Sequence, residues 1–236
     1  MIIPRKNLIF KDQIEAAKAL YDILPVDDIL RTKPLIIVPS LASVLLVDEL
    51  AKMLKLNYEF LFTEKIYSPL NKDCVIGMVS ETEEIVYLEE LVNSFNISMD
   101  YVYGEANRKY EESILKNIYK YRKGKLIQSF QNRDILLLDE GCESGVTALV
   151  CLKSIIGLNP KSLSYATPLI ASDMVANLNS MVDQIYTVRN ITNFVNVDFY
   201  YEEKIELSPQ KIISILETSP YYLPLQKEGE ETCVIE

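Results

Sequence analysis

The segment that most restricts the fold of this chain lies between residues 135 and 156. A run of four apolar residues, Ile135–Leu138, leads directly into the carboxylates of Asp139 and Glu140. A short loop of small and hydroxyl-bearing residues follows, and an apolar helix pattern, Ala148–Ile156, comes after it. Open α/β sheets bind ligands at the carboxyl ends of their strands, and helix N-termini attract anions. The segment therefore predicts a strand, a phosphate-binding loop and a helix in an open α/β sheet.

The loop differs from two common phosphate-binding loops. It lacks the Gly-Lys-Ser/Thr ending of the Walker loop. It also lacks the three-glycine spacing of the dinucleotide-binding fingerprint. The whole chain has only seven glycines, few for a protein that binds phosphate through its backbone.

The segment resembles instead the signature of type I phosphoribosyltransferases. In that family four apolar residues precede an acidic pair, a few loop residues follow, and Thr/Ser-Gly and a closing Thr end the motif. Residues Ile135–Leu138 match the apolar run, and Asp139-Glu140 matches the pair. Ser144, Gly145 and Thr147 match the end of the loop.

The resemblance implies a role for each part of this segment. The acidic pair would bind the ribose 2′- and 3′-hydroxyls of phosphoribosyl pyrophosphate, and its carboxylates suit Mg²⁺ carried in with that substrate. The loop would hold the 5-phosphate by backbone N–H groups and two hydroxyls. The expected substrate-binding residues are Asp139, Glu140, Gly141, Cys142, Ser144, Gly145, Val146, Thr147, Ser40 and Lys65, of which Asp139 and Glu140 are also the expected metal ligands.

Glu143 is the candidate catalytic residue. It stands just before Ser144, where many purine-specific members of the family place an acid that handles a base proton. A carboxylate there could act as general acid or base, or it could be a solvated loop residue. Cys142 lies in the same loop, where a helix N-terminus could activate its thiol; the alternative is a small residue without chemistry.

The resemblance covers most of the chain, from about Asn7 to Leu216, and implies a three-layer α/β/α phosphoribosyltransferase-like fold around a parallel sheet. Alternating strand and helix patterns agree with this α/β class. We expect strands at 35–38, 58–63, 75–79, 85–88, 135–138, 163–168 and 184–188, and helices at 11–24, 45–54, 107–121, 148–156 and 174–182.

The expected domain spans residues 1–218, and residues 89–130 form a helical insertion that we call the hood. The strands at 75–79 and 85–88 predict a hairpin, which resembles the flexible loop that closes over the active site in this family. Residues 219–236 lack periodicity and predict a loosely docked tail.

One loop departs from the family pattern. After the first core strand the nearest subfamily has Pro-Arg-Gly-Gly-Val, which contacts pyrophosphate, whereas this chain has Pro39-Ser40-Leu41-Ala42-Ser43-Val44. The arginine is absent, and so are the glycines that let a backbone approach its ligand closely. Ser40 and Ser43 still offer hydroxyl donors. Two functions therefore stay open: a phosphoribosyltransferase with an altered loop, or a nucleotide- or sugar-phosphate-binding or regulatory protein without catalysis.

The densest positive charge lies in the hood, around the predicted helix 107–121. In one interpretation Arg108 or Arg122 reaches the phosphates of the substrate. In the other, the cations form a solvated face that pairs with acids of the same helix. Those acids are Glu105, Glu111 and Glu112.

Composition excludes several other classes of function. The chain has no histidine, which removes histidine triads and histidine metal ligands. Its four cysteines form no C-x-x-C pair, so structural zinc and dithiol chemistry are disfavoured. A net charge of −10 opposes nonspecific nucleic-acid binding.

We expect a cytoplasmic protein that binds a small phosphoribosyl or nucleotide ligand, and neither nucleic acid nor a membrane. No apolar run approaches membrane-spanning length, and the opening Met1–Lys6 turns polar too soon for a secretory signal. A two-fold homodimer is the default expectation for its assembly, because such dimers are the commonest closed oligomers.

Overall fold

The computed structural model describes residues 10–203 and 206–226. Its centre is a five-stranded sheet in the order β2-β1-β6-β7-β8, in which every neighbouring pair is parallel. The strands are β1 (Leu35–Val38), β2 (Tyr58–Phe60), β6 (Asp134–Leu138), β7 (Ser162–Ala171) and β8 (Gln184–Ile191). The predicted open parallel sheet is confirmed.

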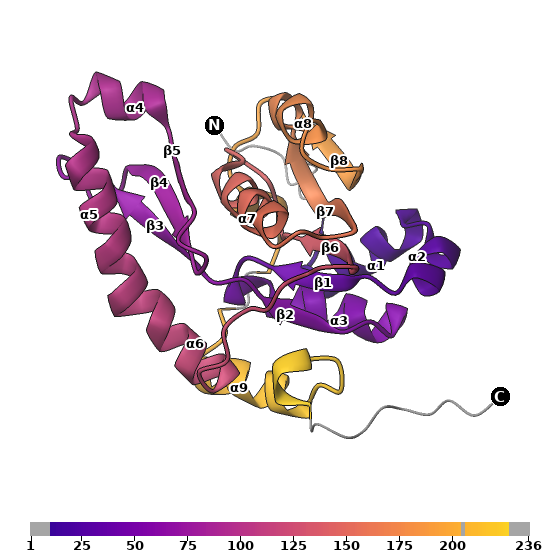
Figure 1. Cartoon of the computed structure of the whole chain (residues 1–236). Helices are drawn as coiled ribbons and strands as arrows, with labels where there is room; N and C mark the ends of the chain where they lie inside the picture. The colour runs from indigo at the N-terminus through magenta and orange to yellow at the C-terminus, as the bar shows by residue number, and fades with distance from the viewer. Residues whose placement is uncertain (1–9, 204–205, 227–236) are drawn as a thin grey trace.

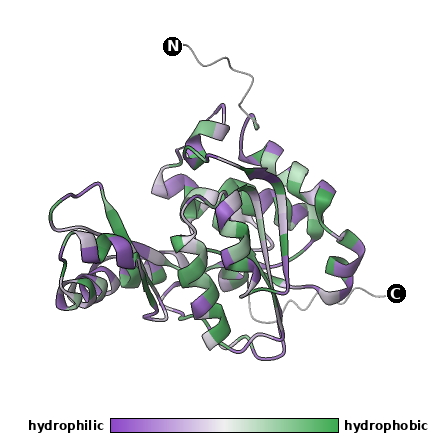
Figure 2. Cartoon of the chain, turned by 90° about the horizontal axis from the view of Figure 1, so that it is seen from above, coloured by the Kyte–Doolittle hydropathy of each residue, from purple (hydrophilic) through white to green (hydrophobic). Residues whose placement is uncertain are grey.

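Helices cover both faces of this sheet (Figure 1). The helices of the first face are α1 (Gln13–Ile23) and α3 (Val44–Leu54), with α2 (Val26–Thr32) beside them, and those of the other face are α7 (Val146–Gly157) and α8 (Ser172–Asn179). Figure 2 shows hydrophobic and hydrophilic residues interleaved along the helices, the pattern of elements with one buried and one solvated face. Among the described residues, no helix is long and apolar enough to cross a membrane.

The central strands are continuous apolar runs because helices cover both of their faces. Ile36 and Val38 of β1 belong to the hydrophobic cluster on the α1–α3 side, whereas Leu35 and Ile37 belong to the cluster on the α7 side. Successive side chains of a strand point to opposite faces, so a strand covered on both faces needs apolar residues at every position. All four residues of β1 are buried accordingly.

A second sheet stands beside the first and is antiparallel, in the order β3-β4-β5. Its strands are β3 (Thr63–Tyr67), β4 (Val75–Ser80) and β5 (Ile85–Tyr87), so the predicted hairpin is confirmed. The prediction of a single strand over residues 58–63 is wrong. The chain leaves the main sheet after β2, passes through the buried Leu61 and Phe62, and enters the second sheet as β3.

The hood packs against this second sheet. It consists of α4 (Glu89–Ser94) and a nearly continuous helix, made of α5 (Met99–Lys109), the π-helical turn η3 (Tyr110–Ile114) and α6 (Leu115–Arg122). Figure 1 shows this helix running past the second sheet toward α9 (Pro209–Thr218). Val102, Ala106, Ile114 and Ile118 form its buried face. The helix predicted at 107–121 is therefore the second half of a longer one.

The C-terminal segment after α9 is firmly packed up to Gln226. Tyr222 is fully buried, forms a parallel bridge with Tyr58, and donates its hydroxyl to the backbone oxygen of Tyr121 at 3.1 Å. The prediction of a loosely docked tail is thus wrong for residues 219–226, because buried aromatic rings anchor the segment without any helical or strand periodicity. Residues 227–236 of that prediction lie outside the described residues.

We predict that Tyr222→Ala lowers the free energy of unfolding by about 3–5 kcal/mol, because it empties a site in the core. Tyr222→Phe keeps the ring and removes one hydrogen bond, so its cost should be about 1 kcal/mol. Urea denaturation measures both values. Tyr119→Ala is the control, since Tyr119 is 70% exposed. Equal losses for Tyr222→Ala and Tyr119→Ala would contradict the anchoring role of Tyr222.

Candidate functional site

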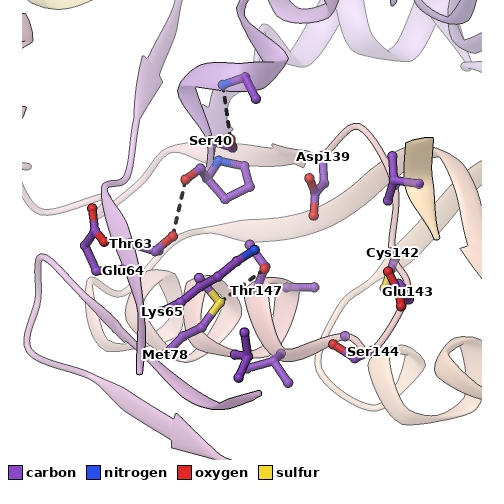
Figure 3. A pocket seen from close by; sticks show the side chains of 18 of the residues that line it. Ser40, Thr63, Glu64, Lys65, Met78, Asp139, Cys142, Glu143, Ser144 and Thr147 are labelled. Carbon is purple, nitrogen blue, oxygen red and sulfur yellow. Dashed lines mark hydrogen bonds between the residues drawn. The ribbon is translucent and has the colours of Figure 1, made fainter. Parts of the chain in front are cut away.

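A cleft of about 680 Å³ opens at the carboxyl ends of β1 and β6, where the second sheet faces the main one. Figure 3 shows the β6–α7 loop on one side of it and β3 on the other. The structure brings together in this cleft every residue of the predicted site: Ser40, Lys65, Asp139, Glu140, Gly141, Cys142, Glu143, Ser144, Gly145, Val146 and Thr147. Their chemical roles stay predictions at this point.

The β6–α7 loop ends at an open helix N-terminus. Gly145 is the N-cap residue of α7 and adopts the left-handed conformation, with φ at 72°. In the described part of the chain no side chain caps this twelve-residue helix, so the N–H groups of its first turn can receive an anion. A Cβ atom at Gly145 would lie 2.8 Å from the Met174 sulfur. The backbone angle therefore favours glycine there, and any other residue would also displace the Met174 side chain.

The acidic pair follows β6 directly and is largely withdrawn from water. Asp139 is 6% exposed, and its Oδ1 accepts the backbone N–H of Glu140 at 2.8 Å. Burial and then the charge of Glu140 raise the pKa of Asp139 to about 7. Burial and then the charge of Asp198 raise the pKa of Glu140 to about 6. The pair therefore shares protons near neutral pH and can both donate to and accept from hydroxyl groups.

The same pair fits Mg²⁺ only in part. Carboxylate oxygens are ligands that Mg²⁺ prefers, and Asp139 and Glu140 supply them. The described residues contain no group of three or more acidic, cysteine or histidine side chains arranged to hold a metal ion. A Mg²⁺ at this pair would therefore take further oxygen ligands from a bound substrate and from water, as phosphate-bound magnesium does.

Two N–H groups of the loop after β1 are hydrogen-bonded within the loop. Residues Leu41–Ser43 form a short 3₁₀ turn, η2, in which the Ser40 hydroxyl accepts the N–H of Ala42 at 3.1 Å. The N–H of Ser43 donates to the backbone oxygen of Ser40 at 3.2 Å. Ser43 is fully buried, so Ser40 carries the one hydroxyl of this loop that lines the cleft among the described residues.

Lys65 supplies positive charge from the opposite wall. Figure 3 shows its side chain pointing from β3 into the cleft, whereas Glu64 lies on the other side of the strand. Among the described residues that line the cleft, Lys65 is the one lysine or arginine. Its charge also favours the ionised form of Glu140 and lowers the pKa of that carboxyl, against the larger effect of burial. An anionic ligand would thus depend on Lys65 and on the backbone N–H groups of α7.

Neither arginine of the hood reaches the cleft, so that hypothesis is wrong. Arg122 is buried, forms an ion pair with Glu81 and lies 3.8 Å from Glu59. Arg108 pairs with Glu105 at 2.7 Å and with Glu112 at 2.6 Å on the outer face of the helix. The alternative, a salt-bridged helix face, is confirmed for Arg108. The sequence predicted no buried position for Arg122.

Two loop residues that were considered for chemistry differ in exposure. Cys142 is buried, and burial together with the charge of Asp139 raises its pKa to about 12, which disfavours a nucleophilic thiol. Its backbone instead ties the loop to β7, since its N–H donates to Leu169 at 2.8 Å and its oxygen accepts from Ala171 at 2.9 Å. Glu143 is exposed and lines the cleft, and its catalytic role stays a prediction.

Sequence reasoning missed Gln13, the first residue of α1. Its Nε2 donates to the Glu140 carboxylate at 2.9 Å and to the backbone oxygen of Ala42 at 2.8 Å. Its Oε1 accepts the N–H of Leu46 at 3.2 Å. No local pattern signals these contacts, because Gln13 and Glu140 are 127 positions apart in the sequence.

No family model and no curated protein matches the chain. The crystal structure of TT1426 from Thermus thermophilus covers 88% of this chain and 97% of its own, with a TM-score of 0.68 and 21% identity. The two chains share one fold, with a parallel central sheet covered by helices on both faces in this chain. More distant matches include the purine phosphoribosyltransferase from Pyrococcus horikoshii, at 9% identity, TM-score 0.39 and coverage of 78% and 93%. Another is a hypoxanthine phosphoribosyltransferase from Staphylococcus aureus, at 12% identity, TM-score 0.42 and coverage of 80% and 78%.

We predict that Asp139 makes the stability of the protein depend on pH. The unfolded carboxyl ionises near pH 3.8, whereas the folded one keeps its proton up to about pH 7. The folded state therefore binds the extra proton in this window, and the contribution of Asp139 to the unfolding free energy falls as the pH rises through it. The fall is on the order of 1.4 kcal/mol per pH unit.

Asp139→Asn should remove this dependence. As the pH rises from about 4 to 7, the unfolding free energy of the wild type should fall relative to that of Asp139→Asn, as measured by chemical denaturation. Glu143→Gln, which replaces an exposed carboxyl of the same loop, is the control. Parallel curves for the wild type and Asp139→Asn would show that the proton is not held by Asp139.

Proposed function

We propose that this protein binds a 5-phosphoribosyl ligand in the cleft, either phosphoribosyl pyrophosphate or a nucleoside monophosphate. The observation that carries the proposal is the uncapped N-terminus of α7, which opens into the same cleft as the acidic pair. Backbone N–H groups at a helix N-terminus bind phosphate, and a neighbouring acidic pair suits the two ribose hydroxyls. The cleft, at about 680 Å³, is within the usual range for small-molecule sites.

The hydroxyl groups of the loop add to this phosphate site. Ser144 is exposed in the loop, and Thr147 donates its hydroxyl to the sulfur of Met78 at 3.2 Å. A thioether is a weak acceptor, so a phosphate oxygen would be a better partner for Thr147. Lys65 faces the loop across the cleft and would offset the negative charge of the ligand (Figure 3).

In the enzymatic form of the proposal, a nitrogen nucleophile attacks C1 of phosphoribosyl pyrophosphate. The bond from C1 to the pyrophosphate oxygen breaks, its electron pair leaves with pyrophosphate, and a bond from C1 to nitrogen forms. Glu143 takes the proton that the nitrogen loses. Asp139 and Glu140 stabilise the positive charge that develops on the ribose ring. Mg²⁺, when bound, supplies charge neutralisation of the diphosphate.

The second candidate is a binding or regulatory protein that holds the same ligand without chemistry. The loop Pro39–Val44 favours it, because the N–H groups of Ala42 and Ser43 are already bonded to Ser40. A pyrophosphate leaving group would find few donors there. This form predicts binding of ribose 5-phosphate or a nucleoside monophosphate and no release of pyrophosphate.

A thermal-shift titration separates these functions, because a ligand of the native state raises the unfolding midpoint. A larger, Mg²⁺-dependent shift with phosphoribosyl pyrophosphate than with ribose 5-phosphate would support the transferase, and a screen of nucleobases for pyrophosphate release would follow. Equal shifts would support the binding protein. No shift with either ligand or with nucleoside monophosphates would contradict both.

We predict that Gly145→Ala weakens binding of ribose 5-phosphate at least tenfold, because an alanine disfavours the left-handed angle and would meet Met174. Isothermal titration calorimetry measures the affinity. The matched control is Gly157→Ala at the other end of α7, where a Cβ would have nothing within 4 Å. Equal affinities for the two variants would place the phosphate elsewhere.

The cytoplasmic location and the homodimer belong to this proposal as predictions. Size-exclusion chromatography with light scattering measures the assembly. A monomer at micromolar concentration would contradict the dimer and leave the proposed ligand unaffected, since one chain supplies every residue named for the cleft.

A further inference from the structure

Strand β3 is an edge strand of the second sheet, and its free edge runs along the cleft. In the described part of the chain it pairs with β4 alone. Successive side chains of a strand point to opposite faces of the sheet, yet both Glu64 and Lys65 line the cleft. Figure 3 shows these two side chains on opposite sides of the strand. The cleft therefore extends around the edge of β3 and reaches its backbone.

The hydrogen bonds between β3 and β4 determine which backbone groups point out of this edge. The N–H of Glu81 donates to the backbone oxygen of Phe62 at 2.9 Å, so these two residues form a bonded pair. Bonded and non-bonded pairs alternate along an antiparallel ladder. Lys65 comes three positions after Phe62 and lies opposite Met78, which makes this a non-bonded pair. The N–H and C=O groups of Lys65 therefore both point away from β4.

Tyr67 supports this direction two positions further along β3. The register shift between Ile66 and Tyr67 skips a residue of β4, so the alternation along β3 itself continues. The backbone oxygen of Tyr67 accepts the hydroxyl of Tyr101 from α5 at 3.0 Å, outside the ladder. Among the described residues, no side chain bonds the backbone of Lys65 in this way. One donor and one acceptor therefore lie side by side, open to the cleft.

An adjacent N–H and C=O suit a ligand group that carries its own donor beside an acceptor. The lactam rings of hypoxanthine, guanine and uracil have this pair on one edge, where proteins read bases by hydrogen bonds. An ionised phosphate group carries acceptors alone, so the Lys65 C=O would repel it. The uncapped N-terminus of α7 presents N–H groups and suits the phosphate. The two walls of the cleft therefore favour different parts of one nucleotide.

We infer that the free edge of β3 binds the base of a nucleoside 5′-monophosphate. The Lys65 N–H donates to the carbonyl oxygen of a lactam base, and the Lys65 C=O accepts the ring N–H beside it. The inference rests on the proposed function, namely that a 5-phosphoribosyl ligand occupies the cleft. Within that proposal it identifies the class of ligand as a nucleotide with a lactam base.

A proline at position 65 tests the first of these hydrogen bonds in the full chain. Proline removes the N–H, and an edge strand tolerates it where that group points out of the sheet. Lys65→Gln is the matched control, because it removes the charge and keeps the N–H. Calorimetric titrations with inosine 5′-monophosphate and with ribose 5-phosphate give the ratio of the two affinities. The wild type and Lys65→Gln should prefer the nucleotide by about fivefold or more, whereas Lys65→Pro should lose most of this preference.

Equal ratios in Lys65→Pro and Lys65→Gln would overturn the inference and leave the proposed function standing, and so would a wild type that binds both ligands equally. A merely structural effect of the proline would lower both affinities together and leave the ratio unchanged. If neither ligand binds the wild type, the proposed function fails, and the inference fails with it.

A modified ligand tests the second hydrogen bond in the unaltered chain. The monophosphate of 1-methylinosine lacks the ring N–H and should bind about fivefold more weakly than inosine 5′-monophosphate. Equal binding of these two nucleotides would overturn the inference, even where Lys65→Pro does not fold.

Discussion

The ion pair between Arg122 and Glu81 holds the two sheets of the molecule together. Both side chains are 1% exposed, and the guanidinium lies 5.0 Å from the Phe62 ring at the point where the chain passes between the sheets. Glu81 also accepts the backbone N–H groups of Phe62 at 2.9 Å and of Ile127 at 3.2 Å. A buried charge whose partner is removed destabilises a fold strongly. The cleft wall that carries Lys65 depends on this pair.

A second acid makes the cluster more than a simple ion pair. Glu59 of β2 lies beside Arg122, and burial raises the pKa of Glu59 to about 7 although the arginine opposes this effect. The charge of Glu81 therefore offsets that of Arg122, and Glu59 carries a proton up to about neutral pH. The main sheet, the β4–β5 turn and the hood each supply one member of the cluster. Helix α6 is thereby fixed at its C-terminal end, where the segment with Tyr222 covers it.

The parts of the structure that the sequence predicted are those determined by local chemistry. An apolar run, two carboxylates and a small-residue loop were sufficient for β6, the acidic pair and the start of α7, because a strand and a helix N-terminus each have a short pattern. The division of residues 58–63 between two sheets was not predictable, since the apolar run Phe60-Leu61-Phe62 continues from β2 to the start of β3 without a turn residue. Gln13, Arg122 and Tyr222 were missed for one reason: each acts through contacts more than 40 positions away.

The acidic pair and the loop after β1 share one property. In the absence of a ligand, the carboxyl groups hold protons and two N–H groups of the loop are hydrogen-bonded to Ser40. Asp139 and Glu140 reduce their charge by holding protons up to about pH 7 and about pH 6, and Gln13 bonds the second of them to the loop. A bound cation would release these protons, because a neighbouring positive charge favours the ionised form. Binding of such a ligand and proton release are therefore linked at the acidic pair. The affinity of a ligand that brings Mg²⁺ should rise with pH across this window, whereas that of a phosphate held by α7 alone should depend on pH much less.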